Sequence, residues 1–350
     1  MTTLSSRRID GPDDMAALFT RMVELGYSDG LPVIPPTERL VAAMIEHVGL
    51  APEKVIGVVA PEDGMATVEK LAINAVMAGC LPEYFPVVIA AIDAVCDPRF
   101  DLLGIQTTTN PVTPVLIING PIRTKLGIHG GRGCMGPGFR ANATIGRAVK
   151  LALRNIGACP PGEVAKSIHG MPGRFTFCFA ELEEASPWEP FHVEQGYDVR
   201  QSTVSVVGGQ GTINMWIGFS TPQSICHSIA DGMRFYASNG YLRGSGIPVV
   251  VMGPGHASLF AKAGWTKKRI KDEIFGLTPI PLSHIPDERQ ISRPVYEDWS
   301  RDRSINVCRK ADDIVILVAG GSEPYHLTYI PSFTHPEVVI TKTIDEPKET

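Results

Sequence analysis

The chain has 350 residues, of which 44% are hydrophobic and 20% are charged, and its formal net charge is −5. This composition is typical of a globular protein with a large core in one or two domains. The slight acidity and the lack of a basic tract argue against nucleic acid or a membrane surface as a partner. Without an apolar run of about 18 residues or an apolar signal core, we expect a cytoplasmic protein with no membrane span.

The first part of the chain alternates helical patterns with short apolar runs. We expect a flexible tail at 1–11 and a first α/β half at 12–160. Apolar residues recur at helical spacing in several segments, and β-branched runs mark strands between them. The predicted helices are 12–26, 37–48, 66–78, 82–95 and 139–155, and the predicted strands are 55–60 and 113–119.

The second part repeats this alternation. We expect a second α/β half at 161–344 and a charged tail at 345–350, with 277–312 wrapping the surface because it is rich in proline and charge. The predicted strands are 174–181, 202–207, 247–252, 313–319 and 337–344, and the predicted helices are 221–237, 257–264 and 266–275.

Several of the strands are continuous apolar runs that end in glycine or proline. Such runs suit a sheet that is covered on both faces. We therefore predict an α/β fold with a mostly parallel or mixed sheet and helices on both faces. The segments PVLIINGP and PVVVMGP lie 134 residues apart and resemble each other, which predicts two related halves.

A glycine-rich segment, Gly127–Gly138, runs into the predicted helix at 139–155. Unpaired backbone N–H groups and the helix dipole at such a junction favour an anion. Donor side chains gather on the same stretch, and we predict that they bind the carboxylate or phosphate of a small organic anion. They are Arg132, Arg140, Asn142, Thr144 and Arg147. GPGFRA fits the dinucleotide pattern, but it does not directly follow a strand, so a dinucleotide is not favoured.

Cysteine and histidine supply the candidate catalytic groups. The chain has seven cysteines and no CxxC pair, which argues against a disulfide scaffold, a zinc ribbon or a dithiol centre. Cys134 lies among glycines and arginines, a setting that lowers a thiol pKa, so we predict a nucleophile or thiolate there. His129 and His256 are predicted to move protons.

Two further sets of residues have alternative predicted roles. A divalent transition metal is the alternative to thiol chemistry, and its predicted ligands are His129, His256, Glu323 and His326. Glu181, Glu183 and Glu184 form an acidic run that most often is a solvated strand end. Glu181, however, is in phase with the preceding apolar strand and is a candidate buried base, and His192 lies in an ordered loop that suits a pocket wall.

Several stretches resemble the large domain associated with UGSC-type (seleno)proteins. They are SDGLPVIPPT, ATVEKLAINAVMAGCLPEYFPVVIAAIDA, GPGFRANATIGRA, VMGPGHASLFAKAGWTKK and DIVILVAGG. The resemblance implies a thioredoxin-like segment in which Cys or selenocysteine precedes Gly-Ser-Cys, similar to selenoproteins that reductively cleave carbon–heteroatom bonds. This sequence lacks that motif, and Cys134-Met135-Gly136-Pro137 does not match it. Either a separate small redox subunit supplies the thiols or the chain does other chemistry.

Three functions follow from these patterns. The first is an oxidoreductase-like enzyme, or the substrate-binding subunit of one, that acts on a small organic anion and cleaves a carbon–heteroatom bond with a thiol partner. The second is a metal-dependent lyase or hydrolase of a small organic acid. The third is a non-catalytic ligand-binding or partner subunit. The apolar content favours a homo-oligomer in each case.

Overall fold

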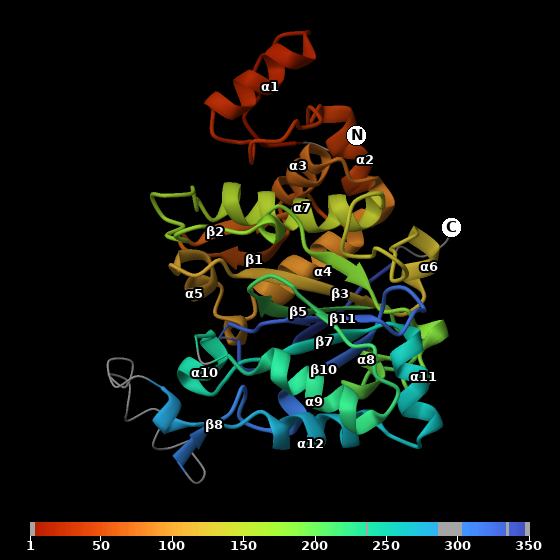
Figure 1. The fold of residues 1–350 in the computed structure, drawn as a ribbon. Helices are drawn as coiled ribbons and strands as arrows, with labels where there is room; N and C mark the ends of the chain where they lie inside the picture. The colour runs from red at the N-terminus through yellow and green to blue at the C-terminus, as the bar shows by residue number, and fades with distance from the viewer. Residues whose placement is uncertain (1–3, 236, 286–302, 334–335, 347–350) are drawn as a thin grey trace.

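The computed structural model describes residues 4–235, 237–285, 303–333 and 336–346. Two mixed β-sheets of four strands each lie against one another, and helices cover both outer faces (Figure 1). The predicted α/β fold is therefore confirmed. No helix in these residues is long and apolar enough to cross a membrane.

The described helices and strands have the following bounds. The α-helices are α1 (Met15–Glu24), α2 (Glu38–Val48), α3 (Val68–Ala78), α4 (Phe85–Val95), α5 (Leu102–Thr107), α6 (Ile122–Leu126), α7 (Arg140–Ile156), α8 (Phe191–Glu194), α9 (Pro222–Met233), α10 (Asn239–Arg243), α11 (Pro254–Lys262) and α12 (Lys267–Leu277). The strands are β1 (Val55–Val59), β2 (Gly64–Thr67), β3 (Thr113–Asn119), β4 (Cys178–Ala180), β5 (Thr203–Gly209), β6 (Ile213–Trp216), β7 (Val249–Met252), β8 (Ile280–Pro281), β9 (Ser304–Ile305), β10 (Val315–Val318), β11 (His326–Ile330) and β12 (Ile340–Thr343).

The two large sheets have the same internal arrangement. The first sheet has the order β12-β5-β3-β4, and the second has the order β10-β7-β11-β6. Each centres on a strand, β3 or β7, with one parallel and one antiparallel neighbour. Along the chain, β5 of the first sheet is followed by β6 of the second, and β11 of the second by β12 of the first. The two sheets are thus interlocked by their edge strands.

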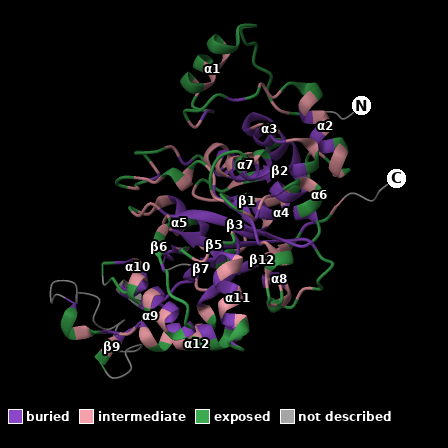
Figure 2. Ribbon diagram, turned by 45° about the vertical axis from the view of Figure 1, so that its right-hand side comes forward, coloured by how far each residue is buried: buried purple, intermediate pink, exposed green. Residues whose placement is uncertain are grey.

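Alternate strand residues enter different apolar clusters. The outer face of the first sheet packs on α4 and α7, with α2 and α3 packed against these helices in the same apolar cluster, and the outer face of the second sheet packs on α9, α11 and α12. A third cluster fills the space between the sheets, with Val115 and Ile117 from β3, Phe179 from β4, and Val249 and Val251 from β7. Both faces of each sheet are therefore buried, as the centre of Figure 2 shows, which explains the continuous apolar runs.

Differences from the predicted elements concern short or less apolar segments. The strand predicted at 174–181 begins later, because Pro172–Arg174 forms a 3-10 turn, η3, and only β4 pairs in the sheet. Strands β2, β6 and β11 were not expected from the sequence pattern, since each is short and only partly apolar. Of the segment predicted to wrap the surface at 277–312, residues 286–302 lie outside the described part.

The carboxyl ends of β4 and β10 meet at one edge of the molecule. The N–H of Leu182 donates to the carbonyl of Val318 at 2.8 Å. The glycine-rich segment lies between the two strand ends, because Ala180 N–H donates to the His129 carbonyl at 3.2 Å and Gly320 N–H donates to the Gly130 carbonyl at 2.8 Å. The strand-end loops of the two sheets therefore converge, with residues 129–131 as the connection between them.

Gly130 permits this close backbone approach, and its replacement is the first test. A Cβ atom at position 130 would lie 2.5 Å from the Ala180 carbonyl oxygen, a backbone atom that cannot move aside. We expect Gly130→Ala to lower the free energy of unfolding by about 1–3 kcal/mol, measured by urea denaturation.

Gly276→Ala is the matched control for this substitution. Gly276 is exposed in α12, and nothing lies within 4 Å of the added Cβ. Alanine should leave stability unchanged or raise it by up to about 1 kcal/mol, because it restricts the unfolded chain and favours the helix. Equal denaturation midpoints for the two variants would contradict the close contact at Gly130.

Candidate functional site

The inner face of the first sheet changes from apolar to polar at the carboxyl end of β3. Going along β3, the inward residues are Val115, Ile117 and then Asn119. Asn119 pairs in register with Thr203 of β5, and Glu181 follows Ala180, the partner of Ile118. Thr203, Asn119 and Glu181 therefore form one polar row across three strands. All three are completely buried.

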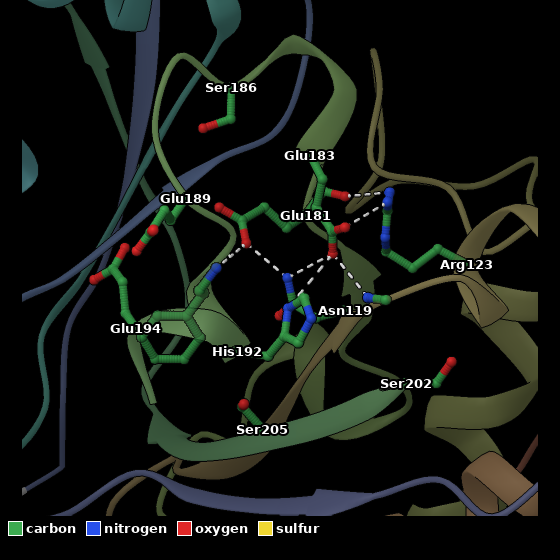
Figure 3. Close-up of polar contacts among 12 residues, drawn as sticks. Asn119, Arg123, Glu181, Glu183, Ser186, Glu189, His192, Glu194, Ser202 and Ser205 are labelled. Carbon is green, nitrogen blue, oxygen red and sulfur yellow. Dashed lines mark hydrogen bonds and ion pairs between the residues drawn. The ribbon is translucent and has the colours of Figure 1, made fainter. Parts of the chain in front are cut away.

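Glu181 is held by donors from two elements. Its Oε2 atom accepts hydrogen bonds from Asn119 Nδ2 at 2.6 Å and from the backbone N–H of Phe191 at 2.7 Å (Figure 3). Phe191 begins α8, so the loop after β4 folds back over the strand end to make this contact. The other oxygen, Oε1, lies 3.6 Å from Lys267 Nζ of α12. Glu181 thus links the first sheet to a helix that packs on the second.

A second carboxylate, Glu183, lies beside this row with 12% of its side chain exposed. Glu183 Oε1 accepts from Asn119 Nδ2 at 2.9 Å and from Gly120 N–H at 2.8 Å. Its Oε2 atom pairs with Arg123 Nη2 at 2.8 Å, and the same guanidinium pairs with Glu184. Because Arg123 is 6% exposed, this is a buried ion-pair network, whereas Glu184 reaches the surface at 57% exposed.

His192 completes the cluster. Its ring is completely buried, faces Asn119 and Glu183 in Figure 3, and has Nδ1 3.9 Å from Glu183 Oε1. Neither ring nitrogen has a hydrogen-bond partner within the described residues, and the same holds for Glu181 Oε1, Asn119 Oδ1 and Thr203 Oγ1. Buried polar atoms normally find partners, so this concentration of unpaired atoms at one strand end points to water or a ligand at that place.

Burial raises the pKa of Glu181 above its ordinary value, because the charged form loses its hydration. Lys267 opposes this shift by favouring the carboxylate, as do the hydrogen bonds from Phe191 and Asn119. Lys267 itself is 7% exposed in its side chain and is bound to Glu194 and to the Glu189 carbonyl. A carboxyl group with a raised pKa keeps its proton to a higher pH than an ordinary glutamate, which suits an acid–base role.

The five donors predicted to hold an anion all have partners inside the protein. Arg147 makes two hydrogen bonds to Asp29, both of 2.8 Å, and Arg140 donates to the Gly79 carbonyl at 3.0 and 3.2 Å. Arg132 pairs with Glu323 at the surface, and Thr144 Oγ1 donates to the Arg140 carbonyl at 2.8 Å. These contacts fix the loop and α7 to their surroundings.

Asn142 holds the glycine-rich segment in its turn. Its amide donates to the carbonyls of His129 at 2.9 Å and Cys134 at 3.1 Å, and its oxygen accepts from His129 N–H at 2.8 Å. An asparagine whose oxygen and nitrogen are both used by backbone groups acts as a clamp on that backbone. In this structure the segment is built as a connection between the sheets.

The environment of Cys134 is the opposite of the one that the sequence predicts. Its side chain is buried in the apolar cluster between the sheets, and burial raises the thiol pKa to about 11. The arginines that suggested a lowered pKa bind elsewhere, Arg132 to Glu323 and Arg140 to Gly79. The prediction of a stabilised thiolate at Cys134 is therefore corrected.

The four predicted metal ligands do not form a metal site. Among the residues that the structure describes, no three histidine, cysteine, aspartate or glutamate side chains are placed to hold a metal ion. Nε2 of His129 donates to the Arg132 carbonyl, and Nε2 of His256 donates to the Ile217 carbonyl, both at 3.0 Å. Glu323 pairs with Arg132. His326 lies near His256, close enough to lower the pKa of that buried imidazole further.

The sequence partly anticipates the polar cluster. Glu181 is recognisable because it continues the inward phase of an apolar strand, and His192 because of its ordered loop. Asn119, Arg123 and Lys267 were not singled out. Asn119 could have been found by the same phase argument on β3, but Lys267 lies 86 residues from Glu181 in the chain and nothing in its local pattern signals the contact.

The fold and this cluster define the class of protein. It is an α/β protein with two interlocked mixed sheets and a buried acid–base cluster where the strand ends converge. Comparison of the sequence with protein-family models and with curated proteins finds no match.

Substitution of two arginines tests whether the Arg123 network contributes more to the free energy of unfolding than the exposed pair of Arg132. Arg123→Met leaves Glu183 buried without its cation, so we expect a loss of about 3–5 kcal/mol in the free energy of unfolding. Arg132→Met removes an arginine that is 72% exposed and should leave the urea midpoint close to wild type. A larger loss for Arg132→Met than for Arg123→Met would contradict the assignment of the buried network.

Glu181→Gln should reveal the raised pKa through the pH dependence of stability. A carboxyl group whose pKa is higher in the folded state stabilises the fold fully below its unfolded pKa, and that stabilisation is lost as pH rises through the folded pKa. Relative to Glu181→Gln, wild type should therefore lose stability as pH rises above the ordinary glutamate pKa of 4.5. Urea denaturation across this range measures the difference, and a constant difference would show an unshifted pKa.

Proposed function

We propose that this protein is an enzyme that transfers a proton to or from a small organic substrate, with Glu181 as the acid–base group. The observation that supports this proposal is a row of buried polar atoms that have no hydrogen-bond partner within the described residues: Thr203 Oγ1, Asn119 Oδ1, Glu181 Oε1 and the His192 ring nitrogens. Leaving such atoms unpaired costs free energy, and proteins retain that cost where a ligand or a reacting group uses them.

Each residue has a role in this proposal. Glu181 exchanges a proton with the substrate through Oε1, the oxygen that Asn119 and Phe191 leave free. Lys267 favours the charged form of Glu181 and so opposes the rise in its pKa that burial causes. His192 and Asn119 offer a donor and an acceptor to a substrate oxygen or nitrogen. Glu183 and Arg123 keep Asn119 in place.

We assign the anionic group of the substrate to Arg132. The cations of the buried cluster already face carboxylates, so they present no free charge to an anion. Arg132 lies at the same edge, two residues beyond Gly130, and its pair with Glu323 is exposed. An exposed ion pair is weak and exchanges readily for a substrate carboxylate. A lyase or hydrolase acting on a small organic acid fits these groups, whereas the buried Cys134 lends no support to the thiol reaction.

Exchange of substrate hydrogen with solvent deuterium tests this function before the substrate is known. The protein is incubated in D₂O with a mixture of small organic acids, and mass spectrometry detects compounds that gain deuterium or are converted. We expect wild type to act on at least one compound and Glu181→Gln to be slower by about 10²–10⁴-fold.

Glu189→Gln is the matched control, because Glu189 is an exposed carboxylate in the same loop whose backbone carbonyl, not its side chain, binds Lys267. This variant should keep the wild-type rate. A Glu181→Gln variant as fast as wild type would refute the proposed role. A compound that binds tightly without exchange or conversion would indicate a ligand-binding subunit.

A further inference from the structure

Most of the buried or half-buried cations among the described residues lie against carboxylates, but Lys150, Arg154 and Arg174 do not. Arg123 faces Glu183, Lys267 faces Glu194, and Arg147 faces Asp29. Lys150 of α7 and Arg174 of η3 are both partly buried, yet neither side chain has a hydrogen bond or ion pair with any described residue. In a chain of net charge −5, two neighbouring cations without a carboxylate are an exception that needs a reason.

The two side chains are brought together by the packing of α7 on the segment before β4. Gly146, one turn before Lys150, packs so closely that a Cβ atom there would lie 2.3 Å from Thr176 Oγ1 and 2.9 Å from the Phe177 nitrogen. Lys150 is one turn further along α7, and Arg174 of η3 is close enough for its charge to act on the Lys150 ammonium. This place is at the amino end of β4, away from the row at Glu181.

The loop after α7 covers the same place. Cys159 N–H donates to the Arg154 carbonyl, and its thiol donates to the Gln106 carbonyl with a sulfur–oxygen distance of 3.6 Å. Lys150, Arg154 and Arg174 all act electrostatically on Cys159, which is 5% exposed. Three cations thus lie near one small buried side chain. Arg154 also donates to the Gly26 carbonyl, so Lys150 and Arg174 are the two that lack partners.

We propose that Lys150 and Arg174 form a binding site for a small oxyanion, a carboxylate or phosphate group, distinct from the proton-transfer site at Glu181. An oxyanion between the two side chains accepts hydrogen bonds from the ammonium and the guanidinium and removes their mutual repulsion. Cys159 contributes a small neutral wall, because burial raises its pKa and keeps the thiol protonated.

Oxyanion binding at this site should depend on pH. Burial, with the nearby Arg174 charge, lowers the pKa of Lys150 to about 7, while Cys159 opposes the shift. An oxyanion binds the protonated amine, so affinity is highest below pH 7 and falls as pH rises through the Lys150 pKa. Well above that pKa the loss approaches about tenfold per pH unit, because each bound anion must then take up a proton.

Sulfate is the first probe, because its charge is constant between pH 6 and 9. Binding is measured by isothermal titration calorimetry at ionic strength held constant with sodium chloride. We expect wild type to bind sulfate at pH 6 and to lose affinity toward pH 9. Lys150→Met and Arg174→Met should each weaken binding at least tenfold. Inorganic phosphate and succinate at pH 6 then distinguish a phosphate-bearing from a carboxylate-bearing ligand.

Lys166→Met is the matched control, since Lys166 is an exposed lysine of the covering loop that donates to the Gly162 carbonyl. It should bind sulfate like wild type. Lys150→Met should also raise the thermal unfolding midpoint in chloride alone, because it removes a half-buried charge that has no ion-pair partner among the described residues, and this rise would show that the variant is folded. Failure of sulfate, phosphate and succinate to bind wild type at pH 6, or equal binding by Lys150→Met, would overturn the proposal.

Discussion

Each large sheet is covered on both of its faces, and the rest of the structure follows from that constraint. A strand residue in such a sheet is buried whichever way it points, so an apolar side chain is favoured at nearly every position. A polar side chain in these strands must find partners or leave unpaired atoms in a medium of low dielectric constant. Thr203, Asn119 and Glu181 are buried polar residues in one row across the sheet. They lie at the strand ends, where loops of both sheets converge, and this position makes the row a candidate functional site.

The same constraint explains how much of the fold the sequence predicts. Long apolar runs such as Thr113–Asn119, and helices with a clear apolar stripe such as α7, are recognisable because burial alone determines their pattern. Strands β6 and β11 are harder to recognise, because each has residues that reach the surface and so lacks a continuous pattern. Strand β6 joins the second sheet directly after β5 of the first, and β12 joins the first sheet directly after β11 of the second. These crossings depend on packing between segments far apart in sequence, so local sequence patterns cannot predict them.

The glycine-rich segment shows why the candidate site was harder to predict than the fold. Glycines, arginines and an asparagine near a helix start fit an anion site and a tightly packed connection equally well. Here Gly130 lies against the end of β4, Asn142 binds the backbone of the turn, and Arg147 binds Asp29. Donor count alone could not distinguish these cases. The distinction lies in whether acceptors within the chain already satisfy the donors, and that requires the positions of residues far apart in sequence.

Charged groups in the interior of this molecule either pair with an opposite charge or have a shifted pKa. Removing a charge from water costs several kcal/mol unless a partner compensates, so Arg123 and Lys267 lie against carboxylates and mainly fix geometry. Where compensation is incomplete, the pKa moves instead, upward for Glu181 and downward for Lys150. A group shifted in this way changes its charge readily when a ligand arrives, whereas a paired group does not. The incompletely compensated groups are therefore the ones that we propose as contacts for a small molecule.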